Sequence, residues 1–423
     1  MASLKITDLR VAVVTRAPMT CPIIRIDTNQ EGLYGLGEVR DGASKTYALM
    51  LKSRLVGENP LDVDRLFRKI KQFGFHGRQA GGVCAVEMAL WDIVGKYYGV
   101  PVYQLLGGKF RDTVRLYADT SESPNPTITG ERLKQRVAQG YGFLKVDVGA
   151  TLLRDVPGTM TRPYDDTWLA EPKPDRPLEE RLRRDGRHTP HPFTGVELTE
   201  KGISILAEYV TEVRRVLGME IPLAVDHFGH IGIKSSIRLG KALENCNLAW
   251  MEDMAPWQYT EQWRRITESL NTPTCTGEDI YLKEGFIELC RQHAVDIVHP
   301  DLATSGGILE TKKIGDIAQD FGIPMAMHFA GTPVSFMANV HCAAATENFY
   351  VLEHHSTEIG WWENLVDGIE KPIVQNGMVT VPDRPGLGVT LNEEVVQANL
   401  DGSGYFEPTP EWDQEYSWDR LWS

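Results

Sequence analysis

The chain has 423 residues, 42% of them hydrophobic and 24% charged, a composition typical of a globular protein with a large core. This length exceeds what one hydrophobic core usually contains, so we expect two domains. The formal net charge is −14, from 44 basic and 58 acidic residues. It argues against nucleic acid or a membrane surface as a partner, because those partners require a clustered basic surface.

Six widely spaced cysteines include no CxxC pair, which argues against a zinc site and a disulfide framework. The segment that begins Met1-Ala2-Ser3 lacks the apolar stretch of a signal peptide, and no run of 18 apolar residues occurs anywhere. We therefore expect a cytoplasmic protein with reduced thiols and no membrane-spanning segment.

The first 112 residues change from strand-like to helical patterning. Residues from about 4 to 40 alternate between apolar and polar types, with glycines at the expected turns. From about Pro60 to Tyr98, apolar residues recur at helical spacing until Gly99-Val100-Pro101. Strands followed by helices predict a small α+β domain over residues 1–112.

From residue 113 to about 385, short β-rich runs alternate with amphipathic stretches such as Gly202–Leu217 and Ile308–Phe321. The runs are Val114–Ala118, Phe143–Val148, Pro222–Asp226, Leu248–Glu252, Pro273–Glu278, Asp296–His299, Ile323–His328 and Tyr350–Glu353. Eight strands that alternate with helices predict an α/β fold, a closed (β/α)8 barrel, with an open doubly wound sheet as the alternative.

Two further segments depart from this rhythm. Residues from about 150 to 196 are rich in Pro, Arg and Asp and follow the second strand, so they would form a lid or a disordered insert at the active-site face. The C-terminal residues 386–423 contain three tryptophans and are expected to return to the first domain.

Ionisable residues end most of the predicted strands. They are Lys145, Asp147, Asp226, Glu252, Glu278, Asp301, His328 and Glu353. The C-terminal ends of barrel strands meet at one mouth, so a row of charged groups there predicts an active site. A single acidic residue at a strand end is usually a helix cap or a solvated turn, but that interpretation does not account for the whole row.

Three carboxylates, those of Asp226, Glu252 and Glu278, fall on adjacent strand ends. They would repel one another in one cavity, and a divalent cation removes that repulsion. An all-oxygen set suits Mg²⁺, whereas zinc prefers nitrogen or sulfur. We therefore predict one Mg²⁺ per subunit; the alternative is three surface carboxylates without a metal.

The other strand ends supply groups for proton transfer. Asp301 is placed to orient the imidazole of His328 as a general acid or base. Lys145 and Asp147 alternate on one strand, so both point into the barrel. Lys145 would neutralise a substrate carboxylate or enolate, and Asp147 would be its partner, a proton-transfer group or a hydroxyl acceptor. With Mg²⁺, these groups suit removal of the proton α to a carboxylate, followed by loss of a β-hydroxide.

Three features of the sequence occur together: the stretch from Val86-Glu87-Met88 to Ile93, the motif Leu105-Leu106-Gly107-Gly108, and intervals of 26, 26, 23 and 27 residues from Asp226 to His328. In these features the chain resembles the mandelate racemase subgroup of the enolase superfamily, and the resemblance covers nearly its whole length. It implies a TIM barrel with a capping domain, a His328–Asp301 dyad, and a Glu353 that hydrogen-bonds the enediolate. It also implies a symmetric homo-oligomer. Enolase-superfamily sites use a Lys or His base with Mg²⁺, so this mechanism comes with the resemblance.

The chain departs from the subgroup at the second strand, where Lys145-Val146-Asp147 replaces the Lys-x-Lys of racemases. Without the second lysine one of two opposed bases is missing, which favours dehydration of an acid sugar over racemisation. The alternatives are a racemase, epimerase or cycloisomerase, and an inactive metal-binding barrel with a ligand-binding or scaffold role. In mannonate- and galactonate-type dehydratases a histidine lies two residues after the first metal ligand, where this chain has Phe228, with His227 and His230 nearby.

In the resembling family the first domain covers the barrel mouth, and its loops select the substrate. The resemblance therefore implies substrate contacts from residues 15–21, from Arg40 beside Asp41, and from His76 and Arg78. The expected partner is a small carboxylate.

Overall fold

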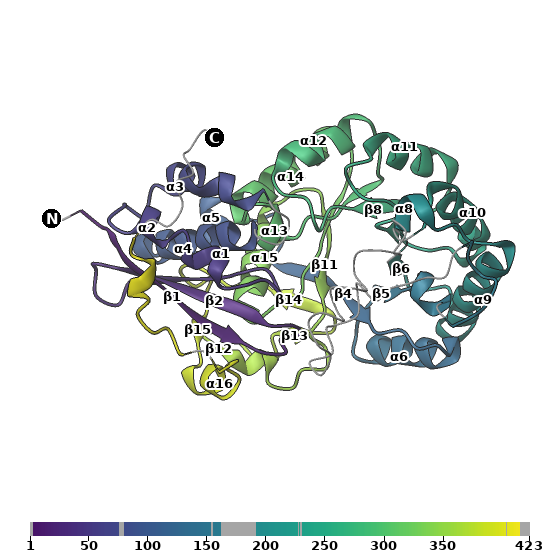
Figure 1. Ribbon diagram of the computed structural model, residues 1–423. Coiled ribbons are helices and arrows are strands. Elements are labelled where there is room, and N and C mark those ends of the chain that lie inside the picture. The colour runs from purple at the N-terminus through teal and green to yellow at the C-terminus, as the bar shows by residue number, and fades with distance from the viewer. Residues whose placement is uncertain are drawn as a thin grey trace, which may run out of the picture.

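The computed structural model describes residues 3–75, 80–153, 155–161, 192–226, 228, 231–402 and 404–414. Figure 1 shows an N-terminal domain built on an antiparallel sheet beside a ring of strands and helices. Of the residues discussed above, His76, Arg78, His227, His230 and most of the predicted insert lie outside the described part of the chain.

The N-terminal domain is a three-stranded antiparallel sheet, β1 (Ile6–Val14), β2 (Cys21–Thr28) and β3 (Tyr34–Glu38), covered by helices. The helical elements are α1 (Thr46–Leu49), α2 (Lys52–Leu55), α3 (Val63–Ile70), η1 (Lys71–Gly74), α4 (Ala80–Tyr98) and α5 (Val102–Leu105). Helix α4 packs so closely on β3 that a Cβ at Gly35 would lie 2.0 Å from the carbonyl oxygen of Ala89. Glycine is therefore required there to let the helix approach the sheet.

Eight parallel strands form the barrel. They are β4 (Thr113–Thr120), β5 (Leu144–Asp147), β6 (Leu223–Asp226), β7 (Met251–Glu252), β8 (Thr274–Thr276), β9 (Ile297–Val298), β10 (Met325–Met327) and β11 (Phe349–His354). Each pairs with the next along the chain, and β11 also pairs with β4, so the sheet closes on itself. The predicted barrel with a capping domain is thus confirmed, and the open-sheet alternative was wrong. Most strands are shorter than their predicted runs.

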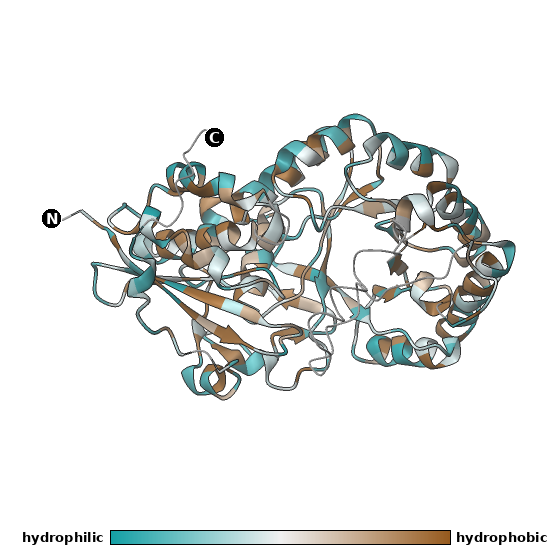
Figure 2. Cartoon of the chain, in the orientation of Figure 1, coloured by the Kyte–Doolittle hydropathy of each residue, from teal (hydrophilic) through white to brown (hydrophobic). Residues whose placement is uncertain are grey.

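Helices on the outside connect the strands. They are α6 (Pro126–Ala138), η3 (Ala150–Leu153), α8 (Pro192–Gly195), α9 (Glu200–Leu217), α10 (Ile233–Leu243), η4 (Glu244–Cys246), α11 (Thr260–Ser269), α12 (Lys283–Arg291), α13 (Leu302–Ser305), α14 (Ile308–Asp320) and α15 (Pro333–Ala345). The outer helices carry both hydrophilic and hydrophobic residues (Figure 2). Helix α15 is buried along its whole length, because it packs against α5 and β3 of the first domain as well as β11.

After the barrel the chain runs back to the first domain. The elements are η5 (Trp362–Leu365), β12 (Val366–Asp367), β13 (Val374–Gln375), β14 (Met378–Thr380), β15 (Thr390–Leu391), α16 (Glu393–Ala398) and η6 (Pro410–Trp412). Asp401 N donates to Val13 O at 2.9 Å, and Lys52 Nζ lies 2.7 Å from Asp413 Oδ1. All six cysteines are free and buried. None of the described helices combines the length and apolarity needed to cross a membrane.

Candidate active site

One side chain from each barrel strand fills the interior below the mouth. These residues are Tyr117, Phe143, Ala224, Trp250, Cys275, Ile297, Ala326 and Val351. Side chains two positions further along a strand face the same side, one layer nearer the mouth. That second layer contains Asp119, Lys145, Asp226, Glu252, Gly277, His299, His328 and Glu353. The interior therefore changes from apolar to ionisable within two residues on almost every strand.

Lys145 lies at the centre of this ionisable layer and is only 3% exposed. Its Nζ is 3.2 Å from Asp226 Oδ2, 3.4 Å from Glu252 Oε1 and 3.1 Å from Glu353 Oε1. Burial alone would lower the pKa of Lys145, but the charges of Glu252 and Glu353 raise it well above its ordinary value. Lys145 is thus a permanent positive charge among three carboxylates.

Donors below the mouth orient two of these carboxylates. Trp250 Nε1 donates to Glu252 Oε2 at 2.8 Å, and His299 Nδ1 lies 3.0 Å from Glu252 Oε1. Tyr117 OH donates to Glu353 Oε2 at 2.8 Å and is 2.9 Å from His299 Nε2. Both carboxylates are fully buried, so these contacts restrict their rotation.

His328 and Asp301 form the predicted pair at the ends of β10 and β9. His328 Nδ1 lies 2.6 Å from Asp301 Oδ2, and the other ring nitrogen is 3.0 Å from Glu278 Oε2 and 3.7 Å from Glu353 Oε2. Burial opposes charge on the imidazole, but Glu278 and Glu353 raise the pKa of His328 well above its ordinary value. Nε2 therefore faces the carboxylates of the interior, while Asp301 sets the orientation of the ring.

Arg40 reaches the same dyad from the loop after β3, and it is 1% exposed. Its Nη1 lies 3.1 Å from Asp301 Oδ2 and 2.6 Å from Thr304 Oγ1, and its Nε is 2.9 Å from Asp41 Oδ1. Burial raises the pKa of Asp301, but the guanidinium of Arg40 and the contact with His328 lower it more. The substrate contact that the sequence suggested for Arg40 stays a prediction; the structure shows that Arg40 contacts Asp301.

Negative charge is concentrated around the expected metal ligands. Asp253, beside Glu252, has a pKa raised well above its ordinary value by burial and then by the charges of Glu278 and Asp226. A hard cation with oxygen ligands suits Asp226, Glu252 and Glu278, because it offsets this charge. In this structure, however, the side chain of Lys145 forms ion pairs with Asp226 and Glu252, and the imidazole of His328 pairs with Glu278.

Within the described ranges, the group whose ligand atoms all lie within 4.8 Å of one another is Glu252, Cys275 and His299. This group could also hold a metal ion, and it shares Glu252 with the predicted set. The predicted carboxylates thus reach one mouth from adjacent strands without forming a single compact cluster.

Asp147 ends β5, where its backbone pairs in register with that of Asp226. It is half-buried and lies one layer above Lys145, towards the mouth. The sequence interpretation missed Tyr117, His299 and Asp119. Counting two residues along each strand from the floor layer would have found Asp119 and His299, since this alternation is a local property of the chain. Tyr117 belongs to the floor layer itself.

The family models match both domains. Residues 3–107 match the N-terminal domain of mandelate racemase / muconate lactonizing enzyme, and residues 129–395 match the enolase C-terminal domain-like family. Two curated relatives are sugar-acid dehydratases by name. D-xylonate dehydratase of Haloferax volcanii is 35% identical over 388 residues, 89% of this chain and 85% of that protein. Arabinonate dehydratase of Saccharolobus solfataricus is 27% identical and covers 90% of each chain.

A solved structure has the same architecture. The mandelate racemase/muconate lactonizing enzyme-like protein from Rubrobacter xylanophilus superposes with a TM-score of 0.80 at 30% identity, and the match covers 96% of this chain and 100% of that one. The family models, the relatives and the layered arrangement of ionisable residues agree. The chain therefore belongs to the mandelate racemase/muconate lactonizing enzyme family of the enolase superfamily.

Proposed function

We propose that the protein is a Mg²⁺-dependent lyase that dehydrates an acid sugar to a 2-keto-3-deoxy acid. The observation that carries this proposal is the oriented imidazole of His328, whose Nε2 faces Glu353 and Glu278 across an interior that also holds Lys145. The names of the relatives, D-xylonate and arabinonate dehydratase, support the reaction class.

The predicted ligands Asp226, Glu252 and Glu278 would hold one Mg²⁺ per subunit, which would act as a Lewis acid towards the substrate carboxylate. Lys145 would place its ammonium beside the same carboxylate and favour the negative charge that develops there. Glu353 would hydrogen-bond the other side of the enediolate. The buried pairings of Lys145 and Glu353 support these roles, because the charges are already oriented before substrate enters.

A Mg²⁺ ion on Glu278 would offset the charge that raises the pKa of His328, and would thereby favour the neutral imidazole. In this scheme Nε2 of the neutral ring takes the proton from the carbon α to the carboxylate. The β carbon–oxygen bond then breaks, and the same imidazole returns the proton to the departing hydroxide, which leaves as water. The resulting enol tautomerises to the α-keto acid. Asp301 keeps the ring oriented throughout, and Arg40 holds Asp301. One base suffices for this reaction, which fits Asp147 in place of the second lysine of racemases.

The test is a screen of Mg²⁺-loaded protein against mono- and diacid sugars, with detection of the α-keto acid formed and EDTA-treated protein as the control. We expect an EDTA-sensitive product from at least one acid sugar. Exchange of the α proton with solvent deuterium without loss of water would instead support a racemase or epimerase. No turnover and no exchange across the library would overturn the proposal and favour the inactive barrel.

Six free buried thiols fit a reducing compartment, so we also propose that the enzyme works in the cytoplasm. We propose a homo-oligomeric assembly on the family resemblance, to be tested by light scattering of the purified protein.

A further inference from the structure

A cavity of about 520 Å³ lies where the first domain meets helices on the outside of the barrel. One wall is a single face of α3, η1 and the residue that follows, with lining residues at helical spacing: Asp64, Phe67, Arg68, Lys71, Gln72 and Phe75. The other wall is formed by the first turn of α12 and by α14. None of the lining residues takes part in the chemistry proposed above. The size of the cavity and its place between two domains are typical of a site for a small molecule.

Contacts between the domains fix the two walls relative to each other. The hydroxyl of Tyr281, just before α12, donates to Lys71 O at 2.7 Å. The ring of Tyr281 also packs edge-on against that of Phe75, with centroids 5.3 Å apart. Lys313 Nζ of α14 lies 3.7 Å from Asp64 Oδ1 of α3. The cavity is therefore formed before a ligand enters, which reduces the ordering that binding would require.

The charges on the barrel wall pair with one another. Glu310 is almost fully buried, and its Oε1 lies 3.0 Å from Lys283 Nζ while its Oε2 lies 3.9 Å from Lys313 Nζ. Lys283 Nζ is also 3.5 Å from Glu284 Oε1. These ion pairs account for the charged groups of this wall, so an additional charge on a ligand would find its partner on the wall of the first domain.

The wall of the first domain carries two cations without a partner. Arg68 and Lys71 lie one helical turn apart, and in the part of the chain that the structure describes no carboxylate lies within ion-pair distance of either. The residues after Phe75, His76-Gly77-Arg78-Gln79, contain no carboxyl group. Arg68 is exposed, and Lys71 is half-buried with its Nζ within reach of solvent. Both head groups are therefore accessible to an anion that enters the cavity.

An aromatic side chain lies on the same helical face as these cations. Phe75 is 60% exposed although its ring touches Tyr281, and Phe67 lies deeper in the wall. Covering such an exposed apolar surface is favourable, because it removes the surface from water. The wall thus offers an anion-binding pair of cations and an apolar surface next to them.

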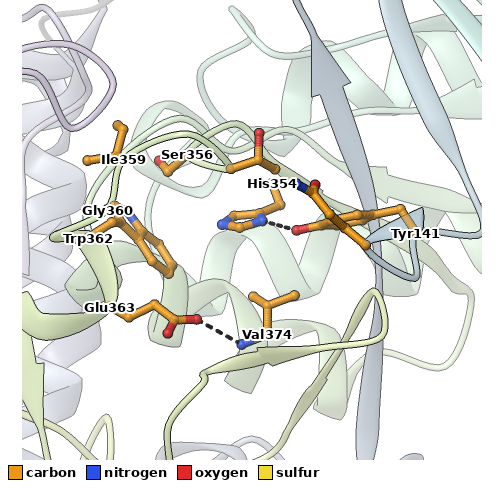
Figure 3. A pocket seen from close by; sticks show the side chains of 10 residues that line it. Tyr141, His354, Ser356, Ile359, Gly360, Trp362, Glu363 and Val374 are labelled. Carbon is orange, nitrogen blue, oxygen red and sulfur yellow. Dashed lines mark hydrogen bonds between the residues drawn. The ribbon is translucent and has the colours of Figure 1, made fainter. Parts of the chain in front are cut away.

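Another cavity, drawn in Figure 3, does not combine these features. It has a volume of about 260 Å³, and its lining residues include no lysine or arginine. Polar groups in its wall contact one another: Tyr141 OH lies 2.5 Å from His354 Nδ1, and Glu363 accepts a hydrogen bond from Val374 N at 3.4 Å. Anion recognition is therefore a property of the cavity beside α3 that this second cavity does not share.

We propose that the cavity beside α3 binds a small molecule with a carboxylate or phosphate group on an aromatic or apolar body. Arg68 and Lys71 hold the anionic group, because a guanidinium and an ammonium both donate to its oxygens. Phe75 packs on the body. One anionic group suits the site better than two, because the exposed carboxylates of Asp64 and Glu284 in the same lining would repel the second. The inference goes beyond the proposed function and does not depend on it.

The experiment measures binding to the Mg²⁺-loaded protein by calorimetry. Phenyl phosphate and benzoate combine both parts of the proposed ligand, whereas inorganic phosphate and phenol have one part each. We expect a two-part probe to bind more tightly than either one-part probe, and the tighter of the two identifies the anionic group. Arg68→Gln/Lys71→Gln should weaken this binding about 10- to 100-fold, the effect of losing hydrogen bonds to charged groups. Phe75→Ala should weaken it about 3- to 10-fold.

Arg65→Gln/Lys69→Gln is the matched control, because it removes two cations from the same helix. Arg65 Nη2 and Lys69 Nζ each lie 2.7 Å from a carboxylate oxygen of Glu58, and neither residue lines the cavity. The control should keep the wild-type affinities. A probe that also binds at the metal site does so equally in both double variants, so the difference between them reports on this cavity alone. The single variant Arg68→Gln, at an exposed position, repeats the test if the double variant is unstable.

Equal affinities of the two double variants for the two-part probes would overturn the proposal, because any binding would then lie elsewhere. It is also overturned if wild-type protein binds phenyl phosphate no more tightly than inorganic phosphate and benzoate no more tightly than phenol. Light scattering of wild-type protein and Phe75→Ala completes the test. A change in oligomeric state, together with no binding of the two-part probes, would make the cavity an interface between copies of the chain instead.

Discussion

At the scale of single residues, the candidate site depends on how each charge is paired. Asp301 Oδ2 contacts both His328 Nδ1 and Arg40 Nη1, at 2.6 Å and 3.1 Å. One carboxylate oxygen thus joins a barrel histidine to an arginine of the first domain. Because Arg40 and Asp301 are almost fully buried, removing either would cost the other a charged partner in a poorly solvated environment.

His328→Asn should abolish removal of the α proton, because asparagine cannot accept it. We expect kcat/KM to fall about 10²- to 10⁴-fold, the usual contribution of a general acid–base group. The measurement is α-keto acid formation together with exchange of the α proton in deuterium oxide. His293→Asn is the control, because His293 is exposed and has a positive φ of 45°, a conformation that asparagine tolerates. Unchanged exchange in His328→Asn would contradict the assigned role.

At the scale of elements, a helix of the first domain caps a helix of the barrel. Glu87 of α4 accepts hydrogen bonds from Ile308 N at 2.6 Å and Leu309 N at 3.0 Å, the first residues of α14. Trp91 Nε1 also donates to Glu87, at 2.7 Å. Burial raises the pKa of Glu87 to about 7, although these hydrogen bonds oppose the rise. The N-terminal N–H groups of α14 thus obtain their acceptor from a different domain.

Glu87→Gln should lower the free energy of unfolding by about 1–2 kcal/mol, because the amide keeps only one acceptor oxygen for these donors. Urea titration followed by circular dichroism measures this change. The control is Glu200→Gln in the first turn of α9, where the carboxylate is 81% exposed and should contribute little. Equal stability of the two variants would show that the contact between α4 and α14 is not a stabilising cap.

At the scale of the whole molecule, the contact between cap and barrel includes a buried carboxyl group. Glu38, at the end of β3, is 1% exposed and accepts a hydrogen bond from Thr332 N at 2.9 Å, just before α15. Burial raises its pKa to about 8, against the opposing effect of hydrogen bonds from Thr332. The protonated form is therefore favoured in the folded protein.

The pKa of Glu38 is about 8 in the folded protein, against 4.5 for the unfolded chain. The contribution of Glu38 to folding stability is therefore fully present below pH 4.5 and is lost as the pH rises through about 8. We expect wild-type protein to lose roughly 3–5 kcal/mol more than Glu38→Gln between pH 4.5 and pH 9. The measurement is the free energy of unfolding of both proteins across this range, taken as a difference so that other titrating groups cancel. Parallel curves would contradict the assignment.

Metal binding should stabilise the whole molecule, because a ligand that binds only the folded state adds its binding free energy to stability. At a Mg²⁺ concentration of about 100 times Kd, the gain is about 2.7 kcal/mol, seen as a rise in Tm relative to EDTA-treated protein. Asp226→Asn should remove most of the rise. A Tm that does not respond to Mg²⁺ in wild-type protein would rule out the proposed ligands.

The order of strands and helices and the row of ionisable strand ends could be predicted from the sequence alone. Both are local properties: apolar spacing marks each element, and alternation decides which residues face the barrel interior. The intervals from Asp226 to His328 follow from the same regular repeat of strand and helix. The closed barrel was predicted on this basis.

Only the tertiary structure decided which charges are paired. Arg40 meets Thr304 and Asp301 from the other domain, Tyr117 joins Glu353 to His299, and Asp119 pairs with His355 across the closure of the barrel. These partners lie far apart in the chain, and no local periodicity relates them. Their contacts arise because the sheet closes and the first domain packs over the mouth of the barrel, which brings these charged groups within a few ångströms of one another. A charge that is buried in this way requires a partner, because an unpaired charge away from water is costly.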